Sequence, residues 1–308
     1  MDRHYPPRDL VGYGEHPPHP HWPGDARIAV SFVLNYQEGG ERNVMDGDAH
    51  SEYYLLETTN SGPIPNKRNL FAEDAFEYGS RAGFWRIMRV FKERNVNFTS
   101  WAVGLALERN PDAARAMAEA GHEVASHGWR WIDYSIVPEV VEREDIRKTI
   151  ETIERLTGTR PYGWYTGRYS DNSIRLLAEE GGTVYLSDFY SDDLPFWRRL
   201  YNKDFIVIPY VMDTNDFKFS LNPGWMSGLD FYEYLKASFD CLYREGETSP
   251  RMMTIGMHGR ILGRPGRAEA LARFIDYILT HERVWVCKRI DIAQHWQKQF
   301  PLAGSAPA

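Results

Sequence analysis

The segment AVSFVL, residues 29–34, is an apolar run interrupted only by Ser31. Such a run is typical of a strand buried on both faces, as in a parallel sheet covered by helices. Further short runs of this kind follow at 98–103, 123–126, 162–165, 184–187, 205–211, 252–257 and 284–286. We therefore expect a parallel sheet that has residues 29–34 as its first strand.

Between these runs lie segments in which apolar side chains recur every three or four residues. Phe84, Met88 and Phe91 share one helical face, and the same spacing recurs at 146, 150 and 153, at 232, 235, 239 and 242, and at 271, 275 and 278. Gly121 and Gly181, each just before a predicted strand, stand where helix C-caps are expected. The alternation predicts an α/β fold, either a closed (β/α) barrel or a doubly wound sheet, in one domain over residues 1–308.

The composition is that of an ordinary globular protein of 308 residues, with 43% hydrophobic and 26% charged residues. The net charge of −7, without a basic stripe, argues against a nucleic-acid partner. No apolar run approaches the roughly 20 residues that span a bilayer, and the first residues lack the pattern of a secretory signal. Cys241 and Cys287 alone cannot form a disulfide framework. These features predict a cytoplasmic protein without a membrane partner.

Two regions depart from the alternation. Residues 1–27 are rich in Pro and His and are interpreted as an irregular arm. Its HPPHPH stretch at 16–21 lacks a Cys or carboxylate to complete a metal ligand set, which favours a solvent-exposed or packed loop. Residues 36–81 form a long insertion with little periodicity, and its aromatic side chains argue against disorder. Insertions of this length are usually lids or interfaces. We expect this one to roof the C-terminal face of the barrel and to contribute to an oligomer interface.

His127 and His258 occupy equivalent places, each directly after an apolar run and before a glycine. In parallel barrels the reactive groups gather just beyond the C-terminal ends of the strands. One histidine in this place commonly caps its strand, but two at equivalent ends favour a functional role. Glu38 precedes Gly39 and Gly40, which would let the backbone approach a ligand, although a solvated turn carboxylate is an equal alternative. Further strand-end candidates are Asn35, Trp131, Asp133, Arg168, Asp188, Tyr190, Asp213 and Asn215.

At these residues the chain resembles the polysaccharide deacetylase (NodB-homology) family, from about residue 27 to 296. SHGWRW at 126–131 resembles the family's His-x-x-x-His metal motif, and SDFYSDDLP at 187–195 resembles its Asp-rich strand-end segment. IGMH at 255–258 resembles its final Leu-x-His motif. The resemblance implies a distorted (β/α) barrel of the deacetylase type, with extra segments inserted at the C-terminal face.

The departures from the family pattern bear on metal binding. The family presents two aspartates after the first strand, whereas here Asn35 falls near the position of the base and Glu38 near that of the ligand. Trp131 stands at the second histidine of the metal motif, and an indole nitrogen is a donor only. Glu38 and His127 alone fall short of the three protein ligands that a catalytic zinc usually has. We therefore predict neither a metal nor another cofactor.

The set of Glu38, His127 and Trp131, together with the run at residues 35–41, resembles the metal-independent PuuE-type allantoinases within the family. The resemblance implies hydrolysis of the hydantoin ring of allantoin to allantoate, by a homotetramer in which inserted segments narrow a glycan groove to a pocket for a small ureide. His258 would then serve as general base and acid, and Glu38 and His127 would hold the ureide or orient the water.

The remaining candidates are assigned to substrate binding. Trp131 would donate to a carbonyl or form an apolar wall, and Asn35 would donate to the developing oxyanion. Tyr165 and Arg168, in the altered arginine motif at 164–168, and Asp188 complete the set, although a surface salt bridge is an equal alternative for Arg168.

Two other functions stay open. One is a metal-dependent deacetylase of a glycan or another amide, which would need a third ligand such as Asp133. The other is a non-catalytic binding module on the same fold. Which of His258 and Glu38 is the general base also stays open.

Overall fold

The computed structural model describes residues 8–58 and 62–302. Its central strand is β1 (Ile28–Tyr36), in which every residue is buried. One edge of β1 pairs in parallel with β8 (Arg251–His258). The other edge pairs with β9 (Val284–Val286) over its first half and with β2 (Thr99–Ala102) over its second half. The apolar run at 29–34 is therefore a central strand, as predicted.

The sheet has the order β6-β7-β5-β4-β3-β2-β1-β8, and its neighbours are parallel except for the pair β6–β7. The remaining strands are β3 (Glu123–Ser126), β4 (Gly163–Trp164), β5 (Tyr185–Leu186), β6 (Phe196–Leu200) and β7 (Lys203–Val207). From β5 to β1 the order is sequential, without the reversal of a doubly wound sheet. An isolated bridge between Asn215 and Gly256 brings the segment after β7 alongside β8. The sheet thus curls into a distorted, half-open barrel, and of the two predicted topologies the barrel is confirmed.

Strand β6 was not predicted from the sequence. It is a partly exposed strand that carries Arg198 and Arg199, so no apolar run marks it. Tyr201 and Asn202 both have positive φ, as a tight two-residue turn between antiparallel strands requires, and they connect β6 to β7. The strand predicted at 205–211 starts earlier and ends at Val207, shortly before Pro209, which has no N–H for a ladder.

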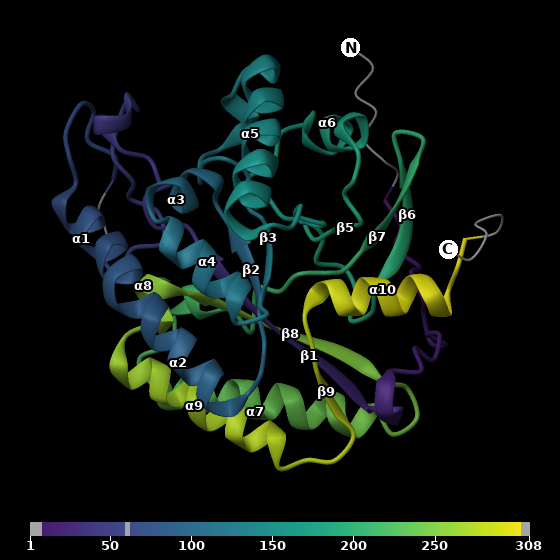
Figure 1. Ribbon diagram of the computed structural model, residues 1–308. Helices are drawn as coiled ribbons and strands as arrows, with labels where there is room; N and C mark the ends of the chain where they lie inside the picture. The colour runs from purple at the N-terminus through teal and green to yellow at the C-terminus, as the bar shows by residue number, and fades with distance from the viewer. Residues whose placement is uncertain (1–7, 59–61, 303–308) are drawn as a thin grey trace.

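The predicted amphipathic segments are helices. In Figure 1, α2 (Phe84–Arg94), α7 (Gly228–Glu245) and α9 (Pro265–Leu279) lie together along one side of the sheet, and α9 contacts both of the others. Their buried aromatic and aliphatic side chains, with those of β1 and β8, form the main hydrophobic core. The other helices of the barrel are α3 (Gly104–Arg109), α4 (Pro111–Glu119), α5 (Glu139–Thr157), α6 (Ser173–Glu180), α8 (Gly259–Leu262) and α10 (Arg289–Gln299).

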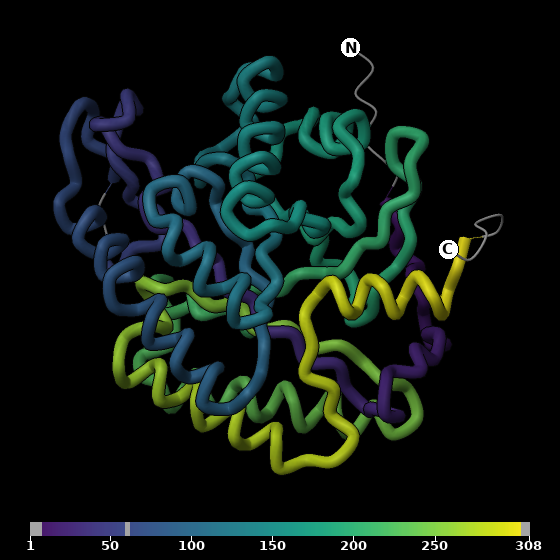
Figure 2. The backbone as a smooth tube through the Cα atoms, viewed as in Figure 1, coloured from purple at the N-terminus to yellow at the C-terminus, as the bar shows by residue number. Residues whose placement is uncertain are grey.

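The insertion at 36–81 contains more regular structure than its weak periodicity predicted. Tyr36 still belongs to β1, and helix α1 (Leu70–Tyr78) continues through a π-helical turn, η3 (Gly79–Gly83), directly into α2. A short 3-10 helix, η2 (Val44–Asp46), lies in the loop before α1. In the tube of Figure 2 this loop projects beside α1 and α3.

The described part of the N-terminal arm packs against the end of the barrel opposite His258. The Trp22 indole donates to the backbone oxygen of Arg251 at 3.0 Å, and the His295 ring bonds the Pro20 oxygen at 2.8 Å. The short helix η1 (Pro23–Asp25) leads from the arm towards β1. Residues 16–21 thus form a loop that packs through Pro20 and leaves His16, His19 and His21 exposed, in agreement with the loop interpretation.

Within residues 8–58 and 62–302, no helix combines the length and the apolar character that crossing a bilayer requires.

Candidate active site

The C-terminal ends of the strands open onto a small cavity of about 120 Å³. Asn35 from β1, His127 after β3 and His258 from β8 meet there. Its lining residues are Asn35, Gln37, Tyr54, Leu55, His127, Trp131, Tyr165, Gly167, Arg168, Tyr210, Met212, Asn215, Phe217 and His258. Pockets for drug-sized molecules measure roughly 300–1,000 Å³, so this cavity suits only a compact molecule. None of the lining residues is acidic, and Tyr54 and Leu55 show that the insertion contributes to the wall, as expected.

His258 is held by a buried carboxylate, Asp216, at the start of the 3-10 helix η5 (Asp216–Ser220). The His258 Nδ1 atom lies 2.6 Å from Asp216 Oδ1. The other carboxylate oxygen accepts the backbone N–H groups of His258 at 2.7 Å and of Leu262 at 3.1 Å. Because an ionised carboxylate only accepts, Nδ1 carries a hydrogen and the Nε2 lone pair is left for the cavity. A histidine oriented in this way is suited to take a proton from a water molecule.

A chain of hydrogen bonds fixes His127 on the opposite wall. Arg260 Nη1 donates to Gln37 Oε1 at 2.9 Å, so the Gln37 amide must present its N–H group to His127 Nε2, 3.0 Å away. His127 Nδ1 lies 3.1 Å from the carbonyl oxygen of Tyr165, which can only accept. Both ring nitrogens of His127 are therefore engaged within the protein.

Burial, followed by the proximity of His258, lowers the pKa of His127 to about 3. The ring is therefore neutral at physiological pH, which agrees with its hydrogen-bond pattern. The prediction that His127 holds the substrate through its nitrogens needs revision, because neither nitrogen is free. Its ring instead forms part of the cavity wall.

Three side chains form a polar cluster between β1 and the segment after β7. Asn35 Nδ2 donates to the Tyr210 phenol at 2.9 Å and to the Met257 carbonyl oxygen at 3.1 Å. Asn215 Nδ2 also donates to the Tyr210 phenol, at 3.3 Å. Since both amide hydrogens of Asn35 are used, the predicted role of Asn35 as oxyanion donor is not supported. Its side-chain oxygen has no partner among the described residues and can accept from a ligand.

The mouth of the cavity is built from a cation and two aromatic rings. The Arg168 guanidinium carbon lies 4.0 Å from the centre of the Trp131 ring and 4.9 Å from that of Tyr54. Such contacts are attractive because the ring faces carry negative potential. Arg168 Nη1 is also 3.9 Å from Glu52, while Nη2 is buried without a partner in the described part of the chain. Arg168 is thus a cavity residue and not part of an exposed surface salt bridge.

Glu38, predicted to contact the substrate, does not line the cavity. Its carboxylate is buried behind the β1 end, where Oε2 accepts the Gln37 N–H at 2.9 Å and Oε1 accepts the Arg260 N–H at 3.2 Å. A Cβ on Gly79 or Gly259 would overlap Glu38 Oε1, so the carboxylate lies wedged between η3 and α8. Burial raises its pKa. Glu38 therefore connects the end of β1 to α8 and packs against η3.

Asp188, the other carboxylate among the predicted substrate contacts, also lies behind the wall. It accepts the backbone N–H groups of Thr166 at 2.8 Å and Gly167 at 2.6 Å. Burial raises its pKa to about 6. Asp188 therefore positions the loop that presents Arg168, and it is not a lining residue.

The metal site implied by the deacetylase resemblance does not fit these donors. The His127 Nε2 lone pair accepts from Gln37, the His258 Nδ1 hydrogen is held by Asp216, and the Trp131 indole offers no lone pair. No group of three or more His, Cys, Asp or Glu side chains gathers in a metal-binding arrangement within residues 8–58 and 62–302. Asp133, the third ligand that a metal-dependent deacetylase would need, does not line the cavity, and its Oδ1 caps the 3-10 helix η4 (Tyr134–Ile136) by accepting from Ser135.

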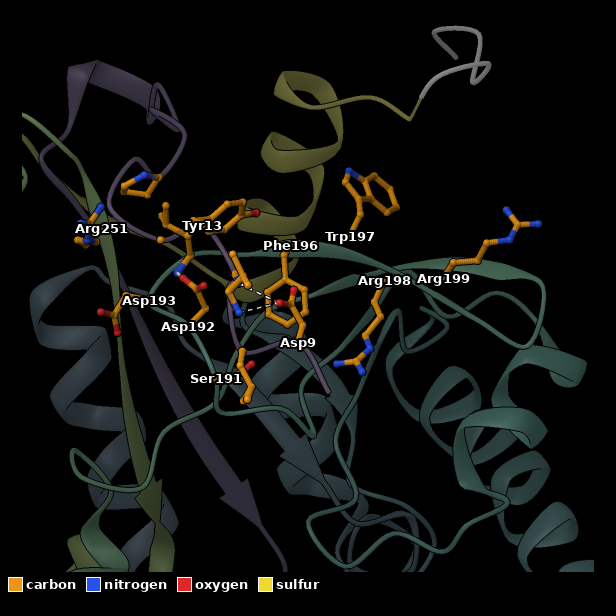
Figure 3. Close-up of a pocket in the computed structure, with 16 residues that line it drawn as sticks. Asp9, Tyr13, Ser191, Asp192, Asp193, Phe196, Trp197, Arg198, Arg199 and Arg251 are labelled. Atoms are coloured by element: carbon orange, nitrogen blue, oxygen red, sulfur yellow. Dashed lines mark hydrogen bonds between the residues drawn. The ribbon is translucent and has the colours of Figure 1, made fainter. Parts of the chain in front are cut away.

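A much larger hollow, of about 970 Å³, lies away from the cavity of His258 and shares no lining residue with it. Figure 3 shows its walls, with Asp9 and Tyr13 of the arm facing Asp192 and Trp197. It also contains Arg251, the first residue of β8, whereas His258 is the last, and seven strand steps separate them by about 23 Å. The Asp-rich segment at 187–195 therefore points mainly into this lateral hollow and not into the cavity of His258.

Sequence reasoning missed Gln37, Asp216 and Tyr210 as site residues. Alternation along a strand could have identified Gln37, since it shares a face with Asn35, while Glu38 shares the opposite face with Tyr36. Asp216 and Tyr210 lie in the irregular segment after β7, where no periodic signal places side chains. Their partners, His258 and Asn35, are far away in the sequence.

Comparisons with known proteins agree with this architecture. A sequence profile described as "Polysaccharide deacetylase" matches residues 74–185. A Schizosaccharomyces pombe protein named "Putative polysaccharide deacetylase" is 42% identical over 96% of this chain and 99% of its own length. A crystal structure described as PuuE allantoinase has a TM-score of 0.94 and 52% identity, over 96% of this chain and 99% of that one. A probable polysaccharide deacetylase from Pseudomonas aeruginosa PAO1 gives the same TM-score and identity over 96% and 100% of the two chains.

Proposed function

Because this chain belongs to the polysaccharide deacetylase family, we propose that it is a hydrolase of amide bonds and that its substrate is a compact cyclic ureide, allantoin, which it converts to allantoate. The observation that carries the proposal is the His258–Asp216 pair beside a cavity of about 120 Å³ whose donors do not suit a metal. The similarity to the structure described as PuuE allantoinase supports the choice of substrate.

The first step is attack of water on the ring carbonyl. His258 Nε2 takes a proton from the water while the oxygen forms a bond to the carbonyl carbon, and the carbonyl becomes an oxyanion. The Asp216 carboxylate stabilises the imidazolium that results, because it accepts the Nδ1 hydrogen.

In the second step the oxyanion collapses and the carbon–nitrogen bond breaks. The proton on His258 passes to the departing ring nitrogen, which lies between two carbonyls and leaves as part of a urea group. The new carboxylic acid ionises at neutral pH. His258 is then neutral again, so one residue serves as base and acid in turn.

Arg168 and Trp131 provide the binding wall in this proposal. Arg168 Nη2, which has no partner among the residues that the structure describes, can donate to a ureide oxygen and balance the charge of the product carboxylate. The flat faces around it suit a planar ring, and the Asn35 side-chain oxygen can accept a ureide N–H group. Fixed donors and acceptors of this kind position the substrate and replace part of the polarisation that a metal supplies in other hydrolases.

The test is a time course with racemic allantoin, with and without a chelator, followed for allantoate. The proposal expects turnover that the chelator leaves unchanged, and no acetate release from acetylated chitin or peptidoglycan fragments. Acetate release that a chelator abolishes, without allantoin turnover, would establish the metal-dependent deacetylase instead. Binding of a hydantoin without turnover of either substrate would favour the non-catalytic module.

A further inference from the structure

Tyr210 lies at the back of the cavity, in the segment that follows β7. It is buried, and its backbone N–H donates to the Phe189 carbonyl oxygen at 2.8 Å. Its ring packs against Tyr165, with the ring centres 4.7 Å apart, and against Trp101 at 6.5 Å. Since backbone and ring are both held, the direction in which the phenol can donate is restricted.

The hydrogen bonds around the phenol oxygen leave its own hydrogen unused. Asn35 must present its N–H group, because its nitrogen also bonds the Met257 carbonyl oxygen, which can only accept. Asn215 must do the same, because its side-chain oxygen accepts the Phe217 N–H group at 3.2 Å. Both lone pairs of the phenol are then occupied. No acceptor for the phenol hydrogen is found among the described residues, and Tyr210 lines the cavity.

We propose that the Tyr210 hydroxyl is the donor that stabilises the oxyanion formed from the substrate carbonyl, a role that rests on the amide hydrolysis proposed above. The two amide N–H groups polarise the phenol and strengthen it as a donor. Burial raises the pKa of Tyr210 above its usual value, which favours the protonated phenol.

The geometry places this donor and the general base on neighbouring sides of one cavity. Asn35, which bonds the Tyr210 phenol, is the β1 residue paired with His258 of β8. Water activated by His258 attacks the carbonyl carbon, and the carbonyl oxygen gains the negative charge while Tyr210 donates to it. The phenol keeps its proton throughout, so the proton taken by His258 remains available for the departing nitrogen.

The first test compares Tyr210→Phe with wild type. Loss of one oxyanion donor typically lowers kcat by about 100- to 1,000-fold. We expect a loss of about 100-fold with KM changed by only a few-fold, and an infrared carbonyl band of bound hydantoin that no longer shifts to lower frequency. The matched control is Tyr36→Phe. The Tyr36 phenol is also buried and accepts from an asparagine amide, Asn110, at 2.9 Å, but it lies outside the cavity.

A second variant covers the case in which Tyr210→Phe fails to fold. Asn215→Asp keeps the acceptor for Phe217 N–H but replaces the donor to the phenol by an acceptor. The phenol hydrogen should then turn from the cavity to the new carboxylate, which lowers kcat and abolishes the infrared shift although Tyr210 is present. The assignment is overturned if Tyr210→Phe keeps kcat within about three-fold of wild type, as Tyr36→Phe should, or if Asn215→Asp keeps the band shift.

These outcomes are distinct from failure of the proposed function. If wild type releases acetate from an acetylated oligosaccharide and ignores allantoin, the proposed substrate is wrong, and the same variants are compared on acetate release. An unchanged kcat on that amide would overturn the role of Tyr210, whereas a loss of about 100-fold would uphold it.

Discussion

At position 258 the ring Nδ1 and the backbone N–H bond to the two oxygens of one carboxylate, Asp216. A single acidic side chain thereby sets both the end of β8 and the tautomer of the histidine. Asp216 is completely buried, and its carboxylate also receives the Leu262 N–H group. This geometry supports the proposed general-base role of His258, and Glu38 does not line the cavity.

We predict that His258→Gln lowers kcat by at least about 100-fold, because a positioned acid–base group is lost. Asp216→Asn should lower it by about 10²- to 10⁴-fold, because an amide can donate to Nδ1 and so select the wrong tautomer. Steady-state kinetics on allantoin measure both effects, and binding of a non-reacting hydantoin should change much less.

The matched control for this prediction is Asp213→Asn. Asp213 lies three residues before Asp216, and within the described residues its side chain bonds only the exposed Tyr234 phenol, at 3.1 Å. The substitution Asp213→Asn should therefore leave kcat unchanged. A full-activity Asp216→Asn enzyme, or a loss of equal size in Asp213→Asn, would contradict the role given to the pair.

At the scale of elements, the unbroken run of α1, η3 and α2 packs against α8 through glycines. A Cβ on Gly83 would overlap the Gly259 carbonyl group, and one on Gly263 would overlap Gly83. The buried Glu38 carboxylate lies in the same junction and accepts the Arg260 N–H at 3.2 Å. This junction supports both the strand end that carries Gln37 and the helix that follows His258.

We predict that Glu38→Gln acts mainly on stability. An amide can replace only one of the two accepted backbone hydrogen bonds, which should cost about 1–3 kcal/mol of unfolding free energy. Thermal or urea unfolding measures the loss, and kcat of the folded variant should stay within about ten-fold of wild type. Glu77→Gln, on an exposed position of α1, is the control with little expected effect. If Glu38→Gln proved more damaging to kcat than His258→Gln, Glu38 would be the base.

Glu41, a second buried carboxylate in the segment after β1, should make the stability of the protein depend on pH. Burial raises its pKa from 4.5 to about 7, although it accepts the Gly39 N–H at 2.7 Å. A raised folded pKa means that its stabilising contribution is complete below pH 4.5 and is lost as the pH rises through 7. Between these values the stability of wild type relative to Glu41→Gln should fall by about 3 kcal/mol. Urea unfolding of both proteins at pH 4.5 and pH 8 tests this, and an unchanged difference would contradict it.

At the scale of the whole molecule, the insertion leaves apolar side chains in solvent. Met45, Ile64, Leu70 and Phe71 are between 49% and 71% exposed. Exposed apolar groups that gather on one segment are typical of interaction surfaces. They support the proposal that the protein is a homo-oligomer, a homotetramer by its resemblance, with residues 36–81 in the interface.

We predict that light scattering at micromolar concentration detects an oligomer and that replacing Leu70 and Phe71 together by Ser shifts it to smaller species. Ile136→Ser is the matched control, since Ile136 is 72% exposed but lies outside the insertion. A monomeric wild type, or a larger shift caused by Ile136→Ser, would contradict the proposed interface.

Local pattern alone identified most of the barrel and part of the site. The apolar run at 29–34 predicted the central strand, and the glycine-flanked His127 and His258 marked two strand ends. These inferences succeeded because strand burial and strand ends depend on neighbouring residues, which the chain displays directly.

Only the tertiary structure decided how the site is assembled. It turned Gln37 into the cavity and Glu38 away from it, and it brought Asp216 to His258 across 42 residues. It also left the Tyr210 hydrogen without an acceptor among the described residues. Strand β6 has no apolar run that would predict a strand, and its pairing with β7 identifies it. The physical reason is the same in each case. Hydrogen bonds between segments far apart in the chain are set by how the strands curl and where the irregular loops pack, and no local periodicity encodes either.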